Sequence, residues 1–397
     1  MVRSEHSWAR TLARRGLVGA ILVLALAAYG LVSAGPQSLA FKPTASVIGG
    51  DGGRSISQAV SPTNNSLNVA TQGPNHTLYF FWNVGGTWFG PLGIGAPGST
   101  WSAPTILAET GPNAGNFDIA VQGPSNTLDF YWDISGTWHG PFEVAAAGTT
   151  FSTPGLFEDT LNHLQMAAQG PSNTLDAYWN VNAQFFGPLQ IGGIGSTFSG
   201  PELSSTESSN GDFYAWVQGP NRDIEQYTRN GSPPVWSGAR DAANDGTAFS
   251  APTSHDGSNR ATFEGPNHSL WDAEGGFRTV VQTQVRGAGT TYSMPSVIPD
   301  TPGDTGPFNR FIANQGPANT LFFYFPDTNT GLLDGPLQIG SPGSTFSGPS
   351  LVQDNNGNED IAVQGPGNAL WAYFDIAGAI HGPLQIGGPG SSFSSNN

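Results

Sequence analysis

The sequence has no cysteine among its 397 residues, and its seven histidines are scattered along the chain. Without cysteine, neither a disulfide framework nor a thiolate metal site can form, so the core and the closure of sheets must hold the fold. The histidines lack zinc-site spacing, and we find no zinc-hydrolase motif, phosphate-binding loop or serine nucleophile elbow. We therefore expect no catalysis, no cofactor and no metal site.

Basic residues are scarce, at 13 against 29 acidic ones. Residues 1–34 hold four of the basic residues and one of the acidic ones, so the remainder carries a formal net charge of −19. A surface of that sign repels phosphate backbones and anionic lipid head groups. We expect no nucleic-acid partner and no membrane contact beyond the N-terminal segment.

A long hydrophobic run begins at Leu17 and ends at about Val32. Four arginines precede it, and the small residues Ser33 and Ala34 follow it, which is the layout of a secretory signal peptide. We expect residues 1–34 to form an apolar helix, cleavage after Ala34, and a secreted or extracytoplasmic protein. An uncleaved membrane anchor is the alternative, because the run is just long enough to span a bilayer. Residues 35–52 are predicted to be a linker.

Turn formers and aromatic residues are abundant in this sequence. Glycine and proline number 55 and 31, and Phe, Trp and Tyr number 24, 11 and 9. The apolar share of 37% is too high for a disordered chain. Many turns with many aromatics predict an all-β fold of short strands.

An internal repeat organises the chain. The phrase Gln-Gly-Pro, once with Glu in place of Gln, recurs every 46 to 51 residues. Periods of 40–50 residues with strand-like content are typical of β-propellers. The seven copies begin at Gln72, Gln122, Gln169, Gln218, Glu264, Gln315 and Gln364.

Each repeat contains four predicted strands. In the second repeat these are residues 104–109, 117–122, 127–132 and 137–144, with the turn sequence "GPSN" between the second and third. In "TLDFYW" bulky side chains occupy both faces, as expected for a blade packed between two neighbours. Seven such repeats predict a seven-bladed β-propeller of four-stranded blades.

A second motif, Gly-x-x-aromatic-Ser, marks the repeat boundaries from Gly98–Ser102 to Gly390–Ser394, with a weaker copy at Gly53–Ser57. The propeller therefore fills residues 53–397, with no second domain. The C-terminal "SSFSSNN" repeats the boundary segment that "RSISQ" provides at the start of the repeat region. We predict that the C-terminal end packs beside the N-terminal strand and closes the ring, which protects the sheet edges.

Aromatic residues recur at one turn of the repeat, in "GGTWFGP" and "SGTWHGP". Trp88, Trp138, Phe185 and Trp236 occupy this position in the first four repeats. An aromatic face beside polar turn groups suits a sugar ring. The alternative is that these aromatics wedge between blades, and the sequence leaves both open.

Two further features have competing interpretations. "DNNGNED" at Asp354–Asp360 resembles the start of a calcium loop, but Asp and Asn are also turn formers, which we favour. Repeats four and five diverge and hold six of the nine basic residues beyond residue 34. Divergence indicates either a specific site or relaxed demands on the sequence.

The repeat "IAVQGPSNTLDFYWDISGTWHGPFEV…GTTFSTP" resembles those of fucose-specific lectin propellers and the related bacterial seven-bladed lectins of the Photorhabdus type. The resemblance covers nearly all of residues 53–397. It implies a sugar site between blades, built from an arginine on the second strand, a glutamate on the third and a tip aromatic. Glycans or glycosylated surfaces would be the partners, with the oligomeric state undetermined.

The residues at the implied arginine and glutamate positions differ from the family in most repeats. Only repeat five keeps a basic and acidic pair, Arg260 and Asp272, to which Trp236 could add the aromatic. The predicted carbohydrate-binding residues are therefore Trp88, Trp138, Trp236, Arg260 and Asp272. The residues at the arginine position are Asn68, Asp118, Gln165, Tyr214, Arg260, Phe311 and Asp360. Those at the glutamate position are Phe80, Phe130, Ala177, Gln226, Asp272, Phe323 and Ala372.

A secreted, non-catalytic, lectin-like propeller is the leading hypothesis. A structural or protein-interaction propeller at the cell surface, with degenerate sugar sites, is the alternative. A sialidase-like glycosidase is a third possibility, since "GSTW" at Gly98–Trp101 resembles the end of an Asp-box. The aspartate of that box is absent, however, from the repeats that align clearly, where Ala96, Ala146, Gly193, Asn244 and Ser341 stand instead.

Overall fold

The computed structural model describes residues 56–205, 212–230, 235–255, 259–275, 280–300, 309–327, 330, 332–376 and 378–393. The predicted signal peptide, its cleavage after Ala34 and the linker at 35–52 lie outside these residues. In the described part of the chain, no helix has the length and apolar character needed to cross a membrane.

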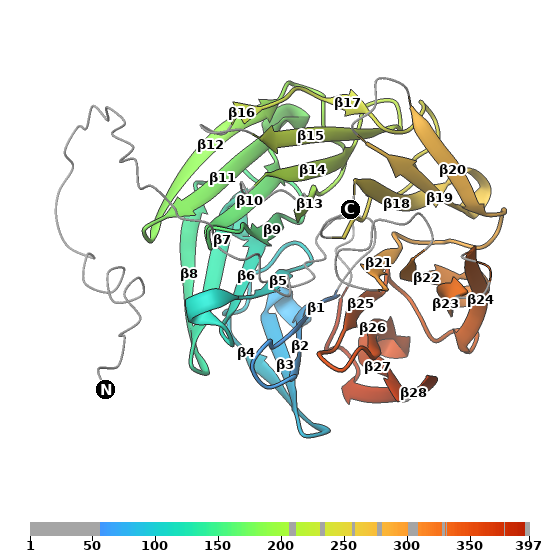
Figure 1. Cartoon of the computed structure of the whole chain (residues 1–397). Coiled ribbons are helices and arrows are strands. Elements are labelled where there is room, and N and C mark those ends of the chain that lie inside the picture. The colour runs from blue at the N-terminus through green and yellow to red at the C-terminus, as the bar shows by residue number, and fades with distance from the viewer. Residues whose placement is uncertain are drawn as a thin grey trace, which may run out of the picture.

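Seven antiparallel sheets lie around a common centre, each built from consecutive strands (Figure 1). This confirms the predicted seven-bladed β-propeller. In blades one to three the strands are β1 Ile56–Val60, β2 Leu67–Gln72, β3 Leu78–Val84 and β4 Thr87–Gly93; β5 Thr105–Ala108, β6 Phe117–Gln122, β7 Leu128–Ile134 and β8 Thr137–Ala145; β9 Gly155–Glu158, β10 Leu164–Gln169, β11 Leu175–Val181 and β12 Gln184–Gly192. In blades four and five they are β13 Glu202–Ser205, β14 Phe213–Gln218, β15 Ile224–Asn230, β16 Val235–Trp236 and β17 Arg240–Asp241; β18 Arg260–Gly265, β19 Ser269–Glu274 and β20 Val281–Arg286. In blades six and seven they are β21 Ser296–Pro299, β22 Arg310–Gly316, β23 Thr320–Asp327 and β24 Leu332–Gly340; β25 Ser350–Gln353, β26 Glu359–Gly365, β27 Ala369–Ile376 and β28 Ala379–Gly387.

The divergent repeats four and five depart from the regular blade. In blade four, β16 and β17 both pair with β15, so the outermost strand is divided into two short pieces. In blade five, the innermost position is taken by a single bridge between Thr253 and Thr262. The skeleton survives both changes because the two middle strands remain fully paired.

The Gln-Gly-Pro phrase ends the second strand of a blade and begins a tight turn to the third. In blade two, Ser125 and Asn126 adopt positive φ angles of 60° and 62° there. Asn tolerates this left-handed conformation better than most residues. The turn predicted from "GPSN" is thereby confirmed.

Alternate side chains of each middle strand pack against the two neighbouring blades. Leu128, Phe130 and Trp132 of β7 join Leu156 and Met166 of blade three in one buried cluster. Tyr131, which points the other way, is buried with Phe80 of blade one. The core is therefore a series of apolar layers between blades, which explains the bulky residues on both faces of each strand.

Hydrogen bonds between the two ends of the propeller close the ring. Phe393 donates its backbone N–H to Gln72 O at 2.8 Å, and Thr71 Oγ1 donates to Ser392 Oγ at 2.9 Å. Elsewhere along the same junction, Asn355 donates its N–H to Asn65 Oδ1 at 2.6 Å. The C-terminal segment thus contacts blade one, as predicted, through β2.

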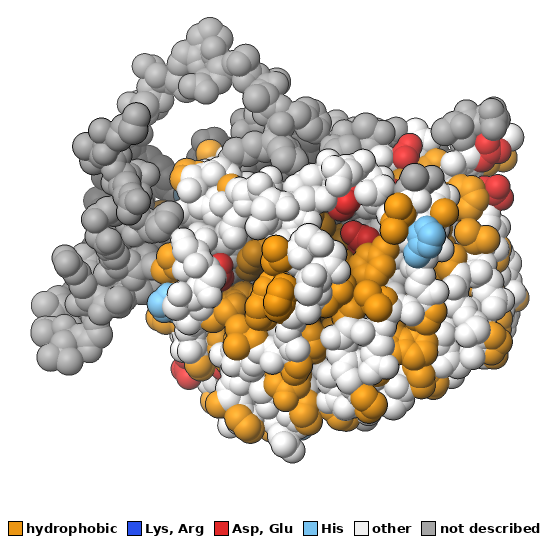
Figure 2. Space-filling view, turned by 90° about the horizontal axis from the view of Figure 1, so that it is seen from below, with side chains coloured by type: hydrophobic (Ala, Val, Ile, Leu, Met, Phe, Trp, Pro, Cys, Tyr) orange, Lys and Arg blue, Asp and Glu red, His pale blue; other side chains and the backbone are white. Residues whose placement is uncertain are grey.

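The side of the molecule in Figure 2 displays acidic side chains and histidines among hydrophobic and neutral ones, with no lysine or arginine in view. This distribution agrees with the acidic excess of the sequence.

Candidate functional site

The boundary aromatics lie at the junctions of successive blades. In blade two, the segment after β8 folds back on the Gln-Gly-Pro turn, where Gly148 N–H bonds Ser125 O at 2.9 Å. Phe151 then donates its N–H to Gln169 O of blade three at 2.8 Å. The same aromatic-to-Gln bond, or its Glu264 equivalent, recurs at all seven junctions. Each boundary aromatic is therefore held in a fixed place.

The glutamine side chain reinforces this junction. Gln122 Nε2 donates to Thr150 O at 3.0 Å and to Asn126 Oδ1 at 2.7 Å, which ties the turn to the boundary segment. Gln169, Gln315 and Gln364 make equivalent bonds. The Gln-Gly-Pro phrase thus recurs because each junction uses the backbone carbonyl of this first residue, its side chain and the turn that Gly-Pro begins.

Six of the seven boundary aromatic side chains are exposed to solvent, and Phe393 is half-buried. Trp101 is 47% exposed and Tyr292, the least exposed of the six with measured values, 39%. Because each occupies the same loop of the repeat, all lie on the same face of the propeller. We name this set the platform aromatics: Trp101, Phe151, Phe198, Phe249, Tyr292, Phe346 and Phe393.

Polar side chains adjoin three of the platform aromatics. The His76 ring stacks on Trp101 with centroids 3.9 Å apart, and His268 stacks on Tyr292 at 4.1 Å. In blade four, the Arg222 guanidinium carbon lies 4.9 Å from the Phe249 centroid. Exposed rings beside hydrogen-bonding groups can stack on the C–H face of a sugar while its hydroxyls find partners.

The predicted binding residues Trp88, Trp138 and Trp236 lie elsewhere, partly buried between blades. Each packs on the preceding blade. Trp88 lies 6.2 Å from Phe374 and Trp138 lies 4.9 Å from Phe80, centroid to centroid. Trp236 belongs to the cluster between blades three and four. These positions agree with the wedge interpretation of the turn aromatics.

The structure brings Arg260 and Asp272 together at the interface of blades five and six. Arg260 Nη1 lies 3.3 Å from Asp272 Oδ2, and its Nη2 pairs with Glu274. Asp272 is 3% exposed, and its Oδ1 also accepts from Thr262 at 3.1 Å and from Arg310 at 2.8 Å. Both oxygens of Asp272 are thus engaged by protein side chains.

Trp236 does not adjoin this pair. It faces blade three, whereas Arg260 and Asp272 face blade six, so blades four and five stand between them. The platform aromatics, in contrast, escaped the search for binding residues although their motif was recognised. The signal that could have found them was the regular Gly-x-x-aromatic-Ser boundary motif. An aromatic residue that only marked a blade junction would not need to be exposed to solvent.

Buried carboxyl groups occupy the position that the resemblance assigns to arginine in blade two. Asp118 is fully buried there beside Glu109, which is 3% exposed. Burial, and then the nearby Glu158, raises the pKa of Glu109 to about 8. Burial, and then Glu109, likewise raises the pKa of Asp118. Glu109 is therefore protonated at neutral pH, and an acidic group stands where the resemblance implies an arginine.

These raised pKa values predict a pH-dependent stability. Glu109 is protonated in the fold up to about pH 8 but ionises near 4.5 when unfolded. The contribution of Glu109 to the free energy of unfolding is therefore complete below pH 4.5. It declines as the pH rises toward 8, by up to about 1.4 kcal/mol per pH unit. In urea unfolding at pH 5 to 8, Glu109→Gln should flatten this decline. The exposed Glu143→Gln should leave it unchanged, and equal slopes in wild type and Glu109→Gln would contradict the prediction.

"DNNGNED" forms a turn. Asp354 Oδ1 accepts the backbone N–H groups of Asn356 and Asn358 at 2.8 and 2.9 Å, and its Oδ2 accepts from Asn65 Nδ2 of blade one at 3.1 Å. These bonds agree with the turn interpretation and add to the closure of the ring.

Comparison with known proteins places this architecture. No protein-family model and no curated protein sequence matches the chain. Among solved structures, the BP39L lectin from Burkholderia pseudomallei is similar, with 18% identity over 84% of this chain and 99% of that one, and a TM-score of 0.72. AofleA from Arthrobotrys oligospora follows with 12% identity, 87% and 94% coverage and a TM-score of 0.54.

The lectin from Aleuria aurantia, described as six-bladed with a fucose recognition mode, has 12% identity, 88% and 98% coverage and a TM-score of 0.50. A ring of six blades superposes less well on one of seven, in keeping with the lower score. At these identities the similarity concerns the fold alone. The chain therefore has the β-propeller fold that is found in lectins from a bacterium and from other organisms.

Proposed function

We propose that this protein is a secreted, non-catalytic, lectin-like propeller that binds carbohydrate through its platform aromatics. The observation that carries the proposal is the presence of one such ring at every blade junction, with the six measured ones 39–47% exposed. Six exposed rings at equivalent places around the ring form a repeated apolar surface, and apolar surface rimmed by polar groups is typical of interaction sites. The lectin fold of the structural neighbours supports the same function.

The proposed ligands are glycans with exposed apolar sugar faces, of which fucosides are the first to test. The fucose recognition described for the Aleuria lectin motivates this choice. Because the platforms repeat around one face, a glycosylated surface could engage several at once. Such multivalent binding can exceed the affinity of one site by about 10²–10⁴-fold.

The test is a glycan array probed with residues 35–397, followed by titration of the strongest ligand. Replacing three adjacent platforms (W101A/F151A/F198A) should lower the number of sites and weaken binding to a multivalent surface by at least about tenfold. The matched control is F89A/F186A, whose rings are 45% and 39% exposed but lie on outermost strands. Equal binding by both variants would place the sugar elsewhere, and R260A then tests the blade-five pair.

A protein-interaction scaffold is the second candidate. Its supporting observation is a set of exposed leucines at matching places on the outermost strands: Leu92, Leu189, Leu337 and Leu384, which are 41–47% exposed. A folded protein that binds no glycan on the array would favour this function over the lectin.

A further inference from the structure

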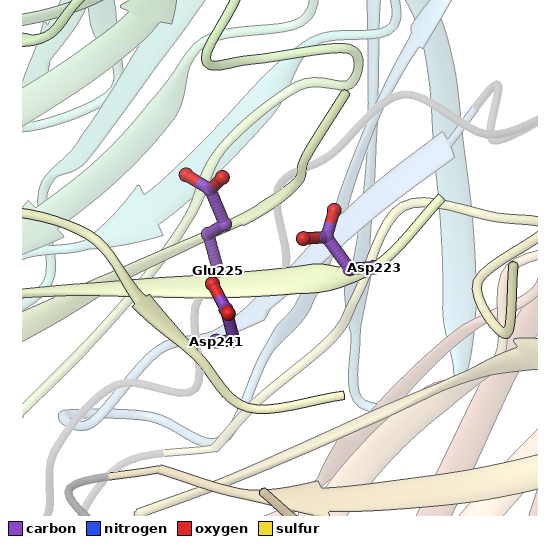
Figure 3. Close-up of side chains that lie close together, drawn as sticks. All are labelled: Asp223, Glu225 and Asp241. Carbon is purple, nitrogen blue, oxygen red and sulfur yellow. The ribbon is translucent and has the colours of Figure 1, made fainter. Parts of the chain in front are cut away.

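Three carboxylates converge in blade four, in the divergent part of the ring. Asp223 directly precedes β15, Glu225 lies within it, and Asp241 ends β17 on the neighbouring edge (Figure 3). One oxygen from each lies within 4.8 Å of the others. Asp223 and Glu225 are buried, at 4% and 8% exposed, while Asp241 is exposed.

Blades two and three, which also have an acidic residue at the place of Glu225, build this place differently. In blade three, Thr174 donates its hydroxyl to the Asp176 carboxylate at 3.3 Å. A Cβ added to Gly170 would lie 2.3 Å from the Thr174 hydroxyl oxygen and 2.0 Å from Asp176 Oδ2. In blades two and three this glycine therefore leaves space for a carboxylate beside a threonine hydroxyl, which in blade three also lies 3.2 Å from Pro171 O.

Blade four replaces the hydroxyl with a second carboxylate. Asp223 stands where Thr174 stands, and Glu225 where Asp176 stands. A Cβ on Gly219 would lie 2.3 Å from Asp223 Oδ1 and 2.9 Å from Glu225 Oε1. Two acceptor oxygens thus face the same space, and the hydroxyl donor of blades two and three is missing.

The remaining contacts do not supply that donor. Tyr227 donates to the other oxygen of Glu225, Oε2, at 2.9 Å. Asp223 Oδ1 is buried and has no hydrogen-bond partner. Arg222, the chain neighbour of Asp223, directs its guanidinium over Phe249.

We propose that Asp223, Glu225 and Asp241 bind a divalent cation that prefers oxygen ligands, of the Ca²⁺ type. Carboxylate oxygens are the ligands of such hard cations, and a cation here takes the place of the missing donor. Asp241 provides the solvent-exposed entry to the two buried oxygens. The site is separate from sugar binding, so each proposal can fail without the other.

The experiment uses chelator-treated full propeller and CaCl₂ alone. Calorimetric titration should reveal one Ca²⁺ per chain, and thermal unfolding should shift upward with Ca²⁺ concentration. At 100 times the Kd, the folded-to-unfolded ratio should rise about 100-fold. D223N, which keeps the shape and removes one charge, should abolish both responses. The matched variant D176N, in the Thr174-satisfied pair of blade three, should retain both.

A shared proton is the competing explanation of the two facing carboxylates. In that case the wild type gives no binding heat and no Ca²⁺-dependent shift, and D223N alters only the pH dependence of unfolding. Either that result or an undiminished Ca²⁺ response in D223N would overturn the proposal.

Discussion

Asp272→Ala should lower the free energy of unfolding by about 3–5 kcal/mol, because it leaves a buried arginine without its counter-charge. Arg310 is 1% exposed, and its Nη1 lies 2.8 Å from Asp272 Oδ1. Its Nε and Nη2 have no hydrogen-bond partner, so Asp272 supplies the one ion pair that the structure gives this guanidinium among the described residues. Urea unfolding at neutral pH measures the loss.

A double-mutant cycle separates the pair from its surroundings. R310M alone should also destabilise, since Asp272 then keeps only the partly exposed Arg260 as a cationic partner. The double variant D272A/R310M should lose less than the sum of the two, because neither charge remains buried alone. Additive losses would mean that the two residues stabilise the interface independently. Asp272 would then be a candidate for a ligand role after all.

Trp216→Ala should destabilise the propeller by about 3–5 kcal/mol through the cavity that it leaves. Trp216 is fully buried between blades four and five, packed with small residues that include Ala242, Ala248 and Ala261. At the equivalent place on the second strand, blade two has the small Ala120. There, Phe130 on the third strand fills the space between the blades. Blade four has Gln226 in place of that phenylalanine, and Trp216 is the largest fully buried side chain of the layer.

The exposed Trp101→Ala is the control, with an expected change within about 0.5 kcal/mol for a surface substitution. Both variants remove the same side chain, and each indole N–H donates one hydrogen bond, from Trp216 to Ser204 and from Trp101 to Gly98, so the difference in urea midpoints mainly reflects burial. A loss at Trp216 no larger than that at Trp101 would show that the alanines of blade five collapse into the space.

Much of the architecture could be predicted from the repeat itself. Seven Gln-Gly-Pro phrases at near-equal spacing, each after an alternating strand, imply seven similar units. A four-stranded unit with two apolar faces can bury both only by standing between copies of itself. Closure of the ring was predicted because "SSFSSNN" duplicates "RSISQ", and the structure makes this contact between Phe393 and Gln72.

The candidate site could not be predicted in the same way. Trp88 and Trp101 lie 13 residues apart in equally regular motifs, yet one wedges against blade seven and the other faces solvent. Local sequence carries no signal for this, because exposure depends on what the adjoining blade brings to each position. The resemblance paired Arg260 with Asp272, but the strand register places Glu274 opposite Arg260, and the buried Arg310 that also pairs with Asp272 comes from the next blade.

The sequence by itself determined the number of blades, their strands and turns, and the closure of the ring, because these depend on spacing and on local alternation. Only the tertiary structure decided which aromatics face solvent, which charges are buried, and which acids meet in blade four. Those properties arise at junctions between blades and between strands, where residues distant in sequence or in strand order share one space. A repeat therefore reveals its scaffold readily, whereas its binding face depends on the contacts that only assembly of the ring creates.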